Sequence, residues 1–283
     1  MITVFTPTYN RKDKLSDLYE SLLNQNNSSF EWLIVDDGSV DGTMDYVSNI
    51  KNENRIIINY FYKDNGGKQS AYNFALNHFN GDIFLCIDSD DVLKENILEG
   101  IEKDFKNLSE EIGGIMYNQG YINEKNKVIG TVFPTDSLID NYFNVYHKHH
   151  VLGDKLIVLK RNVAKEYYFP EFKGERFVPE ALIFNRIALK YKFLCLNKIA
   201  AYKEYLEDGY SNNYFELVKK NPKGNALYFL ELYNMEQSLY NIYGYLLFSI
   251  YGKEKFKSIL KHPNKIMCLL FYFPVLLVAK IRR

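Results

Sequence analysis

The sequence gathers three carboxylates at the end of one apolar segment. Asp88, Asp90 and Asp91 directly follow residues 83–87, a run that predicts a strand buried on both faces. Acids this close repel one another unless a cation or hydrogen-bond donors offset the repulsion. Their hard oxygen atoms suit Mg²⁺ or Mn²⁺, which add substrate phosphate oxygens to their shell. The alternative is a solvated acidic turn that only starts the next helix, and this segment alone does not separate the two.

The composition limits the class of protein. The chain has 283 residues, and Lys plus Arg equals Asp plus Glu at 35 each, so no global field draws it to nucleic acid. The length allows one large domain or one domain with an extension. Cys86, Cys195 and Cys268 lie far apart in apolar runs, which predicts a reduced, cytoplasmic compartment. Residues 1–5 enter a strand at once, so we expect no secretory signal.

Short apolar strands alternate with amphipathic helices along the first hundred residues. Strands are predicted over 3–6, 31–35, 56–62 and 83–87, and helices over 14–25, around 47–50 and over 69–79. This order predicts an α/β fold with a doubly wound, mostly parallel sheet and helices on both faces. Loops that follow parallel strands meet at one edge. The polar clusters at 8–11, 36–39, 65–68 and 88–91 are therefore expected to converge.

The first two of these loops carry groups suited to a nucleotide. Pro7 and Thr8 keep the backbone extended, which opens its polar groups to a base edge, and Tyr9 can stack on that base. Asp37 can accept a hydrogen bond from a base N–H or a ribose hydroxyl. It can equally close an Asx turn within its Asp-Gly-Ser segment.

The third loop carries Gly66, Gly67 and Lys68. The glycines permit close approach of the backbone, and Lys68 supplies a cation for a diphosphate. A Gly-Gly-Lys sequence is also common as a plain flexible turn, and no Walker pattern surrounds this one.

Four motifs occur in order over roughly the first hundred residues: TPTYNR at 6–11, VDDGSVDGT at 35–43, NGGK at 65–68 and DSDD at 88–91. Together they resemble the family 2 glycosyltransferases of GT-A fold, and the ordered set is far more specific than any one motif. The resemblance implies that Asp37 binds the nucleotide base, usually uracil, and that Asp88 and Ser89 lie by the ribose and diphosphate. It also implies that Asp90 or Asp91 ligates the metal, with Asp90 favoured.

A second acidic segment lies at residues 174–180. Pro179 suits the first turn of a helix that continues over 181–189, so Glu180 lies at a helix start, where the dipole favours its ionised form. From this segment alone, a helix-capping acid is the commoner role. The resemblance implies a general base here, although the family's usual Glu-Asp pair is Glu180 followed by Ala181. Glu180 is therefore the candidate base, with Glu175 in reserve.

The middle of the chain offers fewer candidate functional residues. We expect a helix over 96–105 and strands over 112–118, 128–133, 155–159, 193–196 and 199–205, with a turn at 124–127. The cluster at 147–150 lacks a helical spacing of metal ligands and predicts a solvated helix end. Residues 207–212 resemble the closing segment that the family places over the donor phosphates, and no chemistry is assigned to them.

The composition changes to Tyr-, Leu- and Asn-rich helices after residue 212, with a break at 221–224. The fourteen-residue apolar stretch 266–279 contains Pro274, follows Lys261 and Lys265, and precedes Lys280, Arg282 and Arg283. A span needs about twenty residues, so the region 266–283 predicts a helix in the cytoplasmic membrane interface. The alternative is a helix packed on protein. The predicted domains are 1–212, catalytic, with a donor half 1–100 and an acceptor half 101–212, and 213–283, a helical extension.

The resemblance implies an inverting, metal-dependent glycosyltransferase. It would use Mn²⁺ or Mg²⁺ to move a sugar from a nucleotide donor, UDP-linked, to a hydroxyl of a glycan or lipid-linked glycan acceptor. The expected setting is surface polysaccharide synthesis in the cytoplasm, at the inner face of the membrane. One alternative is a non-catalytic glycan-binding or membrane scaffold on the same fold. The other is a phosphoryl-transfer enzyme with an Asp-x-Asp nucleophile, which is expected to carry that motif on its first strand, not its fourth.

Overall fold

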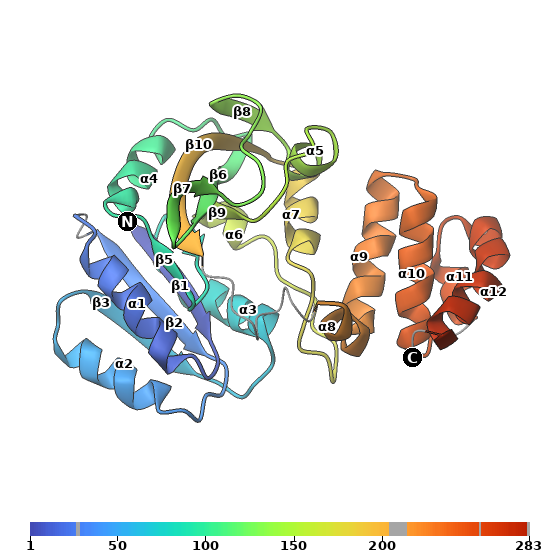
Figure 1. Ribbon diagram of the computed structural model, residues 1–283, viewed down its shortest axis with the longest axis horizontal. Helices are drawn as coiled ribbons and strands as arrows, with labels where there is room; N and C mark the ends of the chain where they lie inside the picture. The colour runs from blue at the N-terminus through green and yellow to red at the C-terminus, as the bar shows by residue number, and fades with distance from the viewer. Residues whose placement is uncertain (27–28, 204–213, 255, 282–283) are drawn as a thin grey trace. The chain divides into compact units, whose positions relative to one another are not determined.

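The computed structural model describes residues 1–26, 29–203, 214–254 and 256–281 of the chain (Figure 1). Two compact units make up the fold. The first unit comprises Met1–Tyr168 and Ile183–Tyr205, and the second comprises Phe169–Leu182 and Leu206–Arg283. The segment 169–182 thus groups with the C-terminal helices, whereas the functional division at residue 212 stays a prediction.

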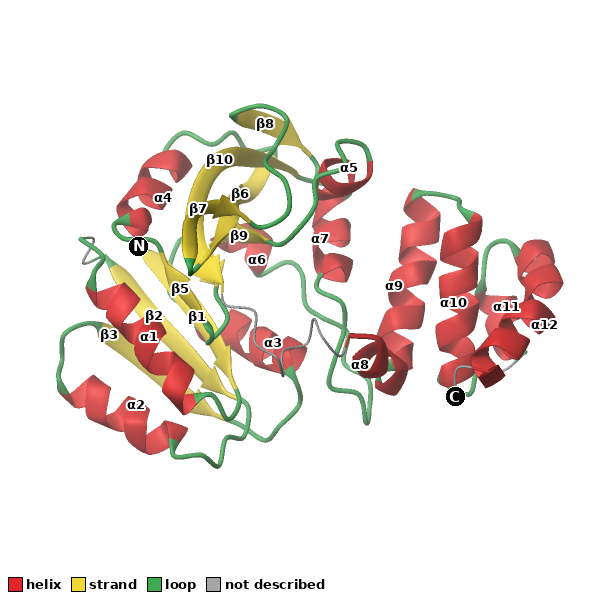
Figure 2. Ribbon diagram, in the orientation of Figure 1, coloured by secondary structure: helices red, strands yellow, loops and turns green. Residues whose placement is uncertain are grey.

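The first unit is built on one sheet that has ten strands in the described part of the chain. The strands are β1 (Ile2–Thr8), β2 (Phe30–Asp36), β3 (Ile57–Tyr62), β4 (Ile83–Cys86), β5 (Asp91–Leu93), β6 (Ile112–Tyr121), β7 (Glu124–Val128), β8 (Ser137–Asp140), β9 (Lys155–Lys160) and β10 (Lys192–Lys203). The helices are α1 (Lys12–Leu23), α2 (Thr43–Asn52), α3 (Lys68–His78), α4 (Ile97–Phe105), α5 (Tyr142–His147), α6 (Arg161–Ala164) and α7 (Ala181–Ala188). Figure 2 shows these helices around the strands.

The strand order confirms the α/β prediction. It runs β3-β2-β1-β4-β9-β6-β10-β5, with β7 on β6 and β8 on β10. The first four strands pair in parallel, as the alternating sequence predicts. β9 runs antiparallel to both β4 and β6, and β10 is parallel to β6. The sheet is therefore mostly parallel on the side that carries the four motifs.

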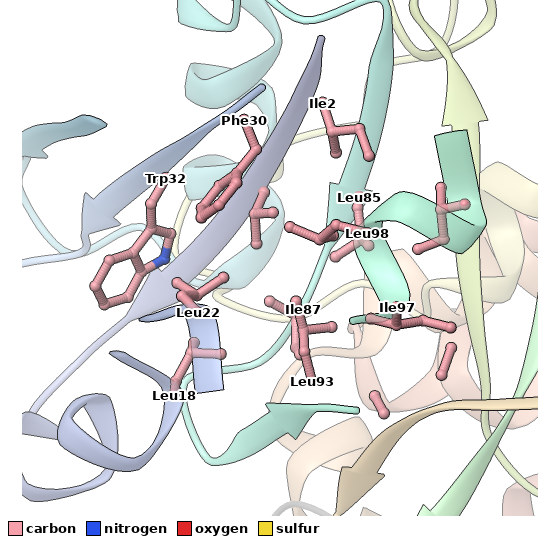
Figure 3. Packing of buried hydrophobic residues seen from close by; sticks show 14 of the residues in the cluster. Ile2, Leu18, Leu22, Phe30, Trp32, Leu85, Ile87, Leu93, Ile97 and Leu98 are labelled. Atoms are coloured by element: carbon pink, nitrogen blue, oxygen red, sulfur yellow. The ribbon is translucent and has the colours of Figure 1, made fainter. Parts of the chain in front are cut away.

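Neighbouring side chains of a strand point to opposite faces, and β1, β2 and β4 are buried almost throughout, so both of their faces are covered. On one face, apolar residues of α1, α4 and the strands pack together; Figure 3 labels Leu18, Leu22, Leu85 and Leu98 among them. On the other face, Phe5 stacks on Phe84 with ring centroids 5.6 Å apart, and Tyr72 of α3 meets both rings edge-on. This double burial explains why β1, β2 and β4 read as continuous apolar runs.

Three predictions in the middle of the chain were wrong. The expected turn at 124–127 is strand β7, whose charged residues give no apolar pattern because the strand is exposed. The expected strand at 128–133 does not form, because after Val128 the chain turns at Gly130, whose φ is +73°. The two strands expected at 193–196 and 199–205 are one strand, β10, as far as Lys203, where this described segment ends, and irregular register between Leu196 and Ala201 interrupts its pattern.

The second unit is helical in its described residues. Its helices are α8 (Tyr214–Lys220), α9 (Pro222–Met235), α10 (Leu239–Tyr251), α11 (Lys257–Lys261) and α12 (Lys265–Ile281). Pro222 is at the start of α9, where its missing N–H costs nothing, which explains the predicted break at 221–224. Tyr245, Phe248, Cys268 and Tyr272 lie in its apolar core. Across the described residues, helix length and hydropathy fall short of what crossing a membrane requires.

A buried carboxylate ties the amino-terminal ends of the parallel strands together. Glu31 of β2 is 3% exposed. It accepts hydrogen bonds from Thr3 Oγ1 at 2.6 Å and Asn59 Nδ2 at 2.8 Å, and from the backbone and side-chain nitrogens of Asn80 at 2.8 and 3.0 Å. These partners belong to β1, β3 and the turn before β4, so one side chain links β2 to two strands and to the turn that leads into a third.

Glu31→Gln replaces two accepting oxygens by one and places an amide donor against Asn59 and Asn80. Buried donors left without acceptors destabilise the fold, and we expect the free energy of unfolding to fall by about 2 kcal/mol. Urea unfolding measures this change. Glu95→Gln, on an exposed residue, is the control and should leave the midpoint unchanged. Equal unfolding midpoints for the two variants would show that the Glu31 hydrogen bonds do not stabilise the sheet.

Candidate functional site

The three predicted carboxylates lie in a tight turn between β4 and β5, which we call the 88–91 turn (Asp88, Ser89, Asp90 and Asp91). The turn is closed by a hydrogen bond from the backbone N–H of Asp91 to the carbonyl oxygen of Asp88, at 3.1 Å. Asp91 and Ser89 are buried, whereas Asp88 and Asp90 are partly exposed. The turn follows β4 and lies at the carboxyl edge of the parallel strands, as expected.

Burial and the charges around the turn shift the pKa values of the three carboxyl groups in different directions. Burial disfavours ionisation of Asp88, but the ammonium groups of Lys68, which forms an ion pair with it, and of Lys203 outweigh that effect and lower its pKa below the usual range. Burial and then the neighbouring charge of Asp88 raise the pKa of Asp90. Burial also raises the pKa of Asp91 well above its usual range, although Lys203 opposes the shift. The turn therefore holds one carboxylate that its lysines keep ionised beside two carboxyl groups whose ionisation burial disfavours.

The donor set fits a hard divalent cation. Asp91 Oδ1 is buried without a hydrogen-bond partner, while Oδ2 accepts from Gln119 Nε2 at 3.2 Å. Across the described residues, no three side chains converge into a closed metal cage. Mg²⁺ and Mn²⁺ do not need one, because one or two carboxylates, waters and substrate phosphates complete their shell. Asp90, being the more exposed, is the carboxylate better placed to meet an ion that arrives with a phosphate.

Lys203 is a site residue that the sequence reading missed. It is the last residue of β10 and the cross-strand partner of Asp91 on β5, and its Nζ lies 3.1 Å from Asp154 Oδ2. Burial acts to lower its pKa, but Asp91, Asp88 and Asp154 together raise it. A single lysine at a strand end carries no signal by itself, and the three-residue strand β5 that brings Asp91 beside it is too short to predict.

The loops after β1 and β2 are fastened to each other. The backbone N–H of Asn10 donates to Ser39 Oγ, and the N–H of Val40 donates to Asn10 Oδ1, both at 2.9 Å. Asp41 accepts from the N–H of Lys12 at 3.0 Å and from the Thr43 hydroxyl at 2.6 Å, so it joins the starts of α1 and α2. These bonds fix the loop backbone on which Tyr9 sits.

Three predicted base-binding residues lie along this edge. Pro7 and Thr8 are the last residues of β1 and are buried, and Thr8 Oγ1 has no hydrogen-bond partner. Tyr9 follows them and is 49% exposed, which leaves its ring open to stacking. Their contact with a base stays a prediction.

The Asp37 carboxylate organises the next loop. It accepts from Lys63 Nζ at 2.7 Å and from the backbone N–H groups of Gly66 and Gly67 at 2.9 and 2.7 Å. The turn expected in Asp-Gly-Ser is closed by Asp36 instead, whose Oδ1 accepts from the N–H of Ser39 at 2.7 Å. Asp37 thus holds the 63–67 segment in place, and its predicted role toward a base stays a prediction.

Gly67 and Lys68 connect that loop to the 88–91 turn. Gly67 has a φ of +89°, a conformation open to glycine at little cost, and α3 begins directly after it at Lys68. The Lys68 ion pair with Asp88 then joins the loop after β3 to the turn after β4. The predicted donor residues of the first unit are therefore brought to one edge of one sheet.

The two candidate bases lie in the second unit and differ in environment. Glu175 is half-buried and accepts from the backbone N–H groups of Lys223, at 3.0 Å, and Gly224, at 3.1 Å. Burial raises its pKa, against those two hydrogen bonds. Glu175 thus caps the start of α9. Glu180 is exposed in the turn directly before α7. Its role as a base stays a prediction, and the structure gives the reserve residue a structural task.

Two further features of the sequence are the 147–150 cluster and the segment 207–212. α5 ends at His147, and His149 Nε2 lies 2.9 Å from Asp140 Oδ2, so the 147–150 cluster borders a helix end. The segment 207–212, compared above with a closing segment, lies outside the described residues.

Comparisons with known proteins agree on one family. The family model described as "Glycosyl transferase family 2" matches residues 3–168. An uncharacterized glycosyltransferase of Rickettsia felis is 36% identical over 133 residues, which cover 46% of this chain and 21% of that protein. The putative teichuronic acid biosynthesis glycosyltransferase TuaG of Bacillus subtilis is 35% identical over 99 residues, covering 35% of this chain and 39% of TuaG. The chain thus spans well under half the length of these curated relatives.

Solved structures share the fold at lower identity. S. aureus TarS in complex with UDP-GlcNAc superposes with a TM-score of 0.65 at 20% identity, covering 89% of this chain and 72% of that one. The mannosyltransferase PcManGT of Pyrobaculum calidifontis, in complex with GDP-Man and Mn²⁺, gives a TM-score of 0.58 at 17% identity over 99% of this chain and 78% of that one. These likenesses establish a GT-A-type fold.

Lys203→Met removes a cation that faces Asp88, Asp91 and Asp154. The uncompensated carboxylates should lower the free energy of unfolding by roughly 3 kcal/mol in EDTA. Mn²⁺ is expected to restore part of that loss, because an ion that binds only the folded state stabilises it. Thermal unfolding with and without Mn²⁺ measures both effects.

Lys198→Met is the matched control on the same strand. Lys198 pairs with Asp104 at 2.7 Å and is 51% exposed, so its loss should cost under about 1 kcal/mol. Equal costs for the two variants would show that Lys203 is an ordinary surface lysine.

Proposed function

The chain belongs to glycosyltransferase family 2, and from this premise we propose that it transfers a sugar from a nucleotide donor to a hydroxyl of a glycan or lipid-linked glycan. The observation that carries the proposal is the 88–91 turn, where three carboxyl groups lie beside Lys68 at the edge that also bears Asp37 and Tyr9. A nucleoside diphosphate matches this edge, with a base near Tyr9, a ribose near Asp88 and Ser89, and a diphosphate near Lys68.

The donor is proposed to be UDP-linked. The structural neighbour TarS binds UDP-GlcNAc, and the relative TuaG is named for teichuronic acid biosynthesis. Both support a hexosyl or N-acetylhexosaminyl donor and a product in surface polysaccharide. PcManGT binds GDP-Man, so GDP is the main competitor in any donor screen. The work is proposed to take place in the cytoplasm at the inner face of the membrane.

A divalent cation is proposed to bind at Asp90, with Asp91 as the second carboxylate. When bound, Mn²⁺ or Mg²⁺ supplies positive charge for the diphosphate that departs. Lys68 adds a protein cation on the same side. Asp37 accepts hydrogen bonds from the N–H groups of Gly66 and Gly67 and so holds the loop directly before Lys68. The orphaned Oδ1 of buried Asp91 supports this assignment, because an ion at the turn would satisfy it.

Glu180 is proposed as the general base of an inverting transfer. It accepts the proton of the acceptor hydroxyl while that oxygen forms a bond to the anomeric carbon. The bond from that carbon to the diphosphate oxygen breaks on the opposite face, so the configuration inverts. Its exposure before α7 supports access to an acceptor, and the capping role of Glu175 leaves Glu180 as the better candidate.

Titration calorimetry of UDP, GDP and CDP, with and without Mn²⁺, tests the donor site. We expect UDP to bind tightest, to require Mn²⁺, and to lose at least tenfold in affinity in Asp90→Asn, because a metal ligand is removed. Asp45→Asn, on an exposed residue of α2, is the matched control and should bind as the parent does. A folded protein that binds no nucleotide would overturn the proposal and favour a non-catalytic scaffold.

Glu180→Gln separates binding from chemistry. Donor affinity should be unchanged, while kcat for transfer falls by about 10² to 10⁴, the usual effect of losing a general base. Glu175→Gln is the comparison and should keep kcat while lowering thermal stability, because it caps α9. If Glu180→Gln loses donor binding together with turnover, its role is structural. If Glu175→Gln loses turnover instead, the base assignment moves to Glu175.

A further inference from the structure

Helix α12 presents an apolar stripe on each of two sides. Cys268, Tyr272, Val275 and Ala279 face inward and belong to the core of the second unit. A second set is exposed, each side chain by about half or more: Ile266, Leu269, Leu270, Phe273, Leu277 and Ile281. A helix of a soluble unit ordinarily exposes polar side chains on the side opposite its core, and this helix exposes apolar ones instead.

The exposed residues form one continuous face. They recur at intervals of three and four residues, which places them on one side of a helix, opposite the inward set. The helix has seventeen residues and is about 25 Å long at 1.5 Å per residue. Phe273, at its middle, is 67% exposed. The face is therefore long and narrow, with its largest side chain near the centre.

The segment of the chain that contains this helix is almost entirely positive in its charged residues. From residue 253 to the end of the sequence there are eight lysines and arginines and one acid, Glu254. Glu254 is itself paired with Lys261 at 2.5 Å. Lys265 and Lys280 are exposed at the two ends of α12. A lysine thus lies near each end of the exposed apolar stripe, although the whole chain has equal numbers of acidic and basic residues.

We propose that this face of α12 docks on an anionic lipid surface. The helix lies in the plane of the interface, with Phe273 and its neighbours at the boundary of headgroups and acyl chains and with Lys265 and Lys280 at lipid phosphates. Two signals, a buried apolar stripe and several cations, are what stable peripheral binding needs. A protein groove would satisfy the stripe equally, but the concentration of positive charge in one tail matches a surface that is anionic throughout.

Flotation of the full-length chain with vesicles tests the proposal without any donor or acceptor. Vesicles of phosphatidylcholine alone are compared with vesicles of equal parts phosphatidylcholine and phosphatidylglycerol. We expect binding to the anionic vesicles, little binding to the neutral ones, and a clear drop in high salt. Leu270→Ser with Phe273→Ser should lower the partition coefficient roughly tenfold or more, because the double variant removes apolar area that would be buried in the lipid interface.

Charge and folding controls accompany that variant. Lys265→Gln with Lys280→Gln should weaken binding to anionic vesicles by about thirtyfold, at about fivefold per charge removed. Leu189→Ser removes an apolar side chain that is 74% exposed in the first unit and should bind as the parent does. The altered α12 residues are exposed, so circular dichroism and thermal unfolding are expected to match the parent.

Two outcomes would overturn the proposal. One is vesicle binding that is absent, or that the α12 variants leave unchanged. The other is self-association seen by light scattering that the Phe273→Ser variant abolishes, which would identify a second copy of the chain as the occupant. Vesicle binding is measured without nucleotide, so its failure and a failure of the UDP titration are separate results.

Discussion

The compensation of negative charge at the 88–91 turn is the constraint on which the rest of the first unit depends. Lys68 starts α3, after the third strand, and Lys203 ends the tenth. Lys203 reaches the turn only because β5 runs back antiparallel to β10. The carboxylates and their two cations therefore come together only when the sheet has formed in its full order. A bound divalent cation would add to this balance rather than create it.

The surrounding motif residues divide into those the fold uses and those it leaves available. Asn10 and Asp41 accept hydrogen bonds from backbone N–H groups of the neighbouring loop. Asp36 accepts from the Ser39 N–H of its own loop and from the Tyr60 hydroxyl. Their presence in the motifs is explained by loop geometry alone. Tyr9 and Asp90 are instead exposed or half-exposed. A motif that names a family thus mixes residues that shape the edge with residues that can meet a ligand, and contacts separate the two.

The sequence predicted the parallel half of the sheet and the convergence of its loops, because period, length and turn chemistry are local signals. It did not predict β7, whose charged residues resemble a turn, or the single strand β10, whose irregular register reads as a break. Lys203 could not be found because its importance comes from a partner more than a hundred residues away in sequence. Glu175 was predicted as the reserve base, and its capping role was missed because its target, the start of α9, is a long-range contact.

The second, helical unit includes the segment that carries the candidate base. The segment 169–182 belongs to it, and the Glu175 cap on α9 is reinforced by the Arg176 N–H, which donates to Asn221 Oδ1 at 2.7 Å. Glu180 lies four residues farther along that fastened segment. The conformation of the candidate base therefore depends on α8 and α9, whose core also holds α12. If α12 rests on a lipid surface, the same unit connects that surface to the residue proposed to activate the acceptor, which suits an acceptor that is itself lipid-linked.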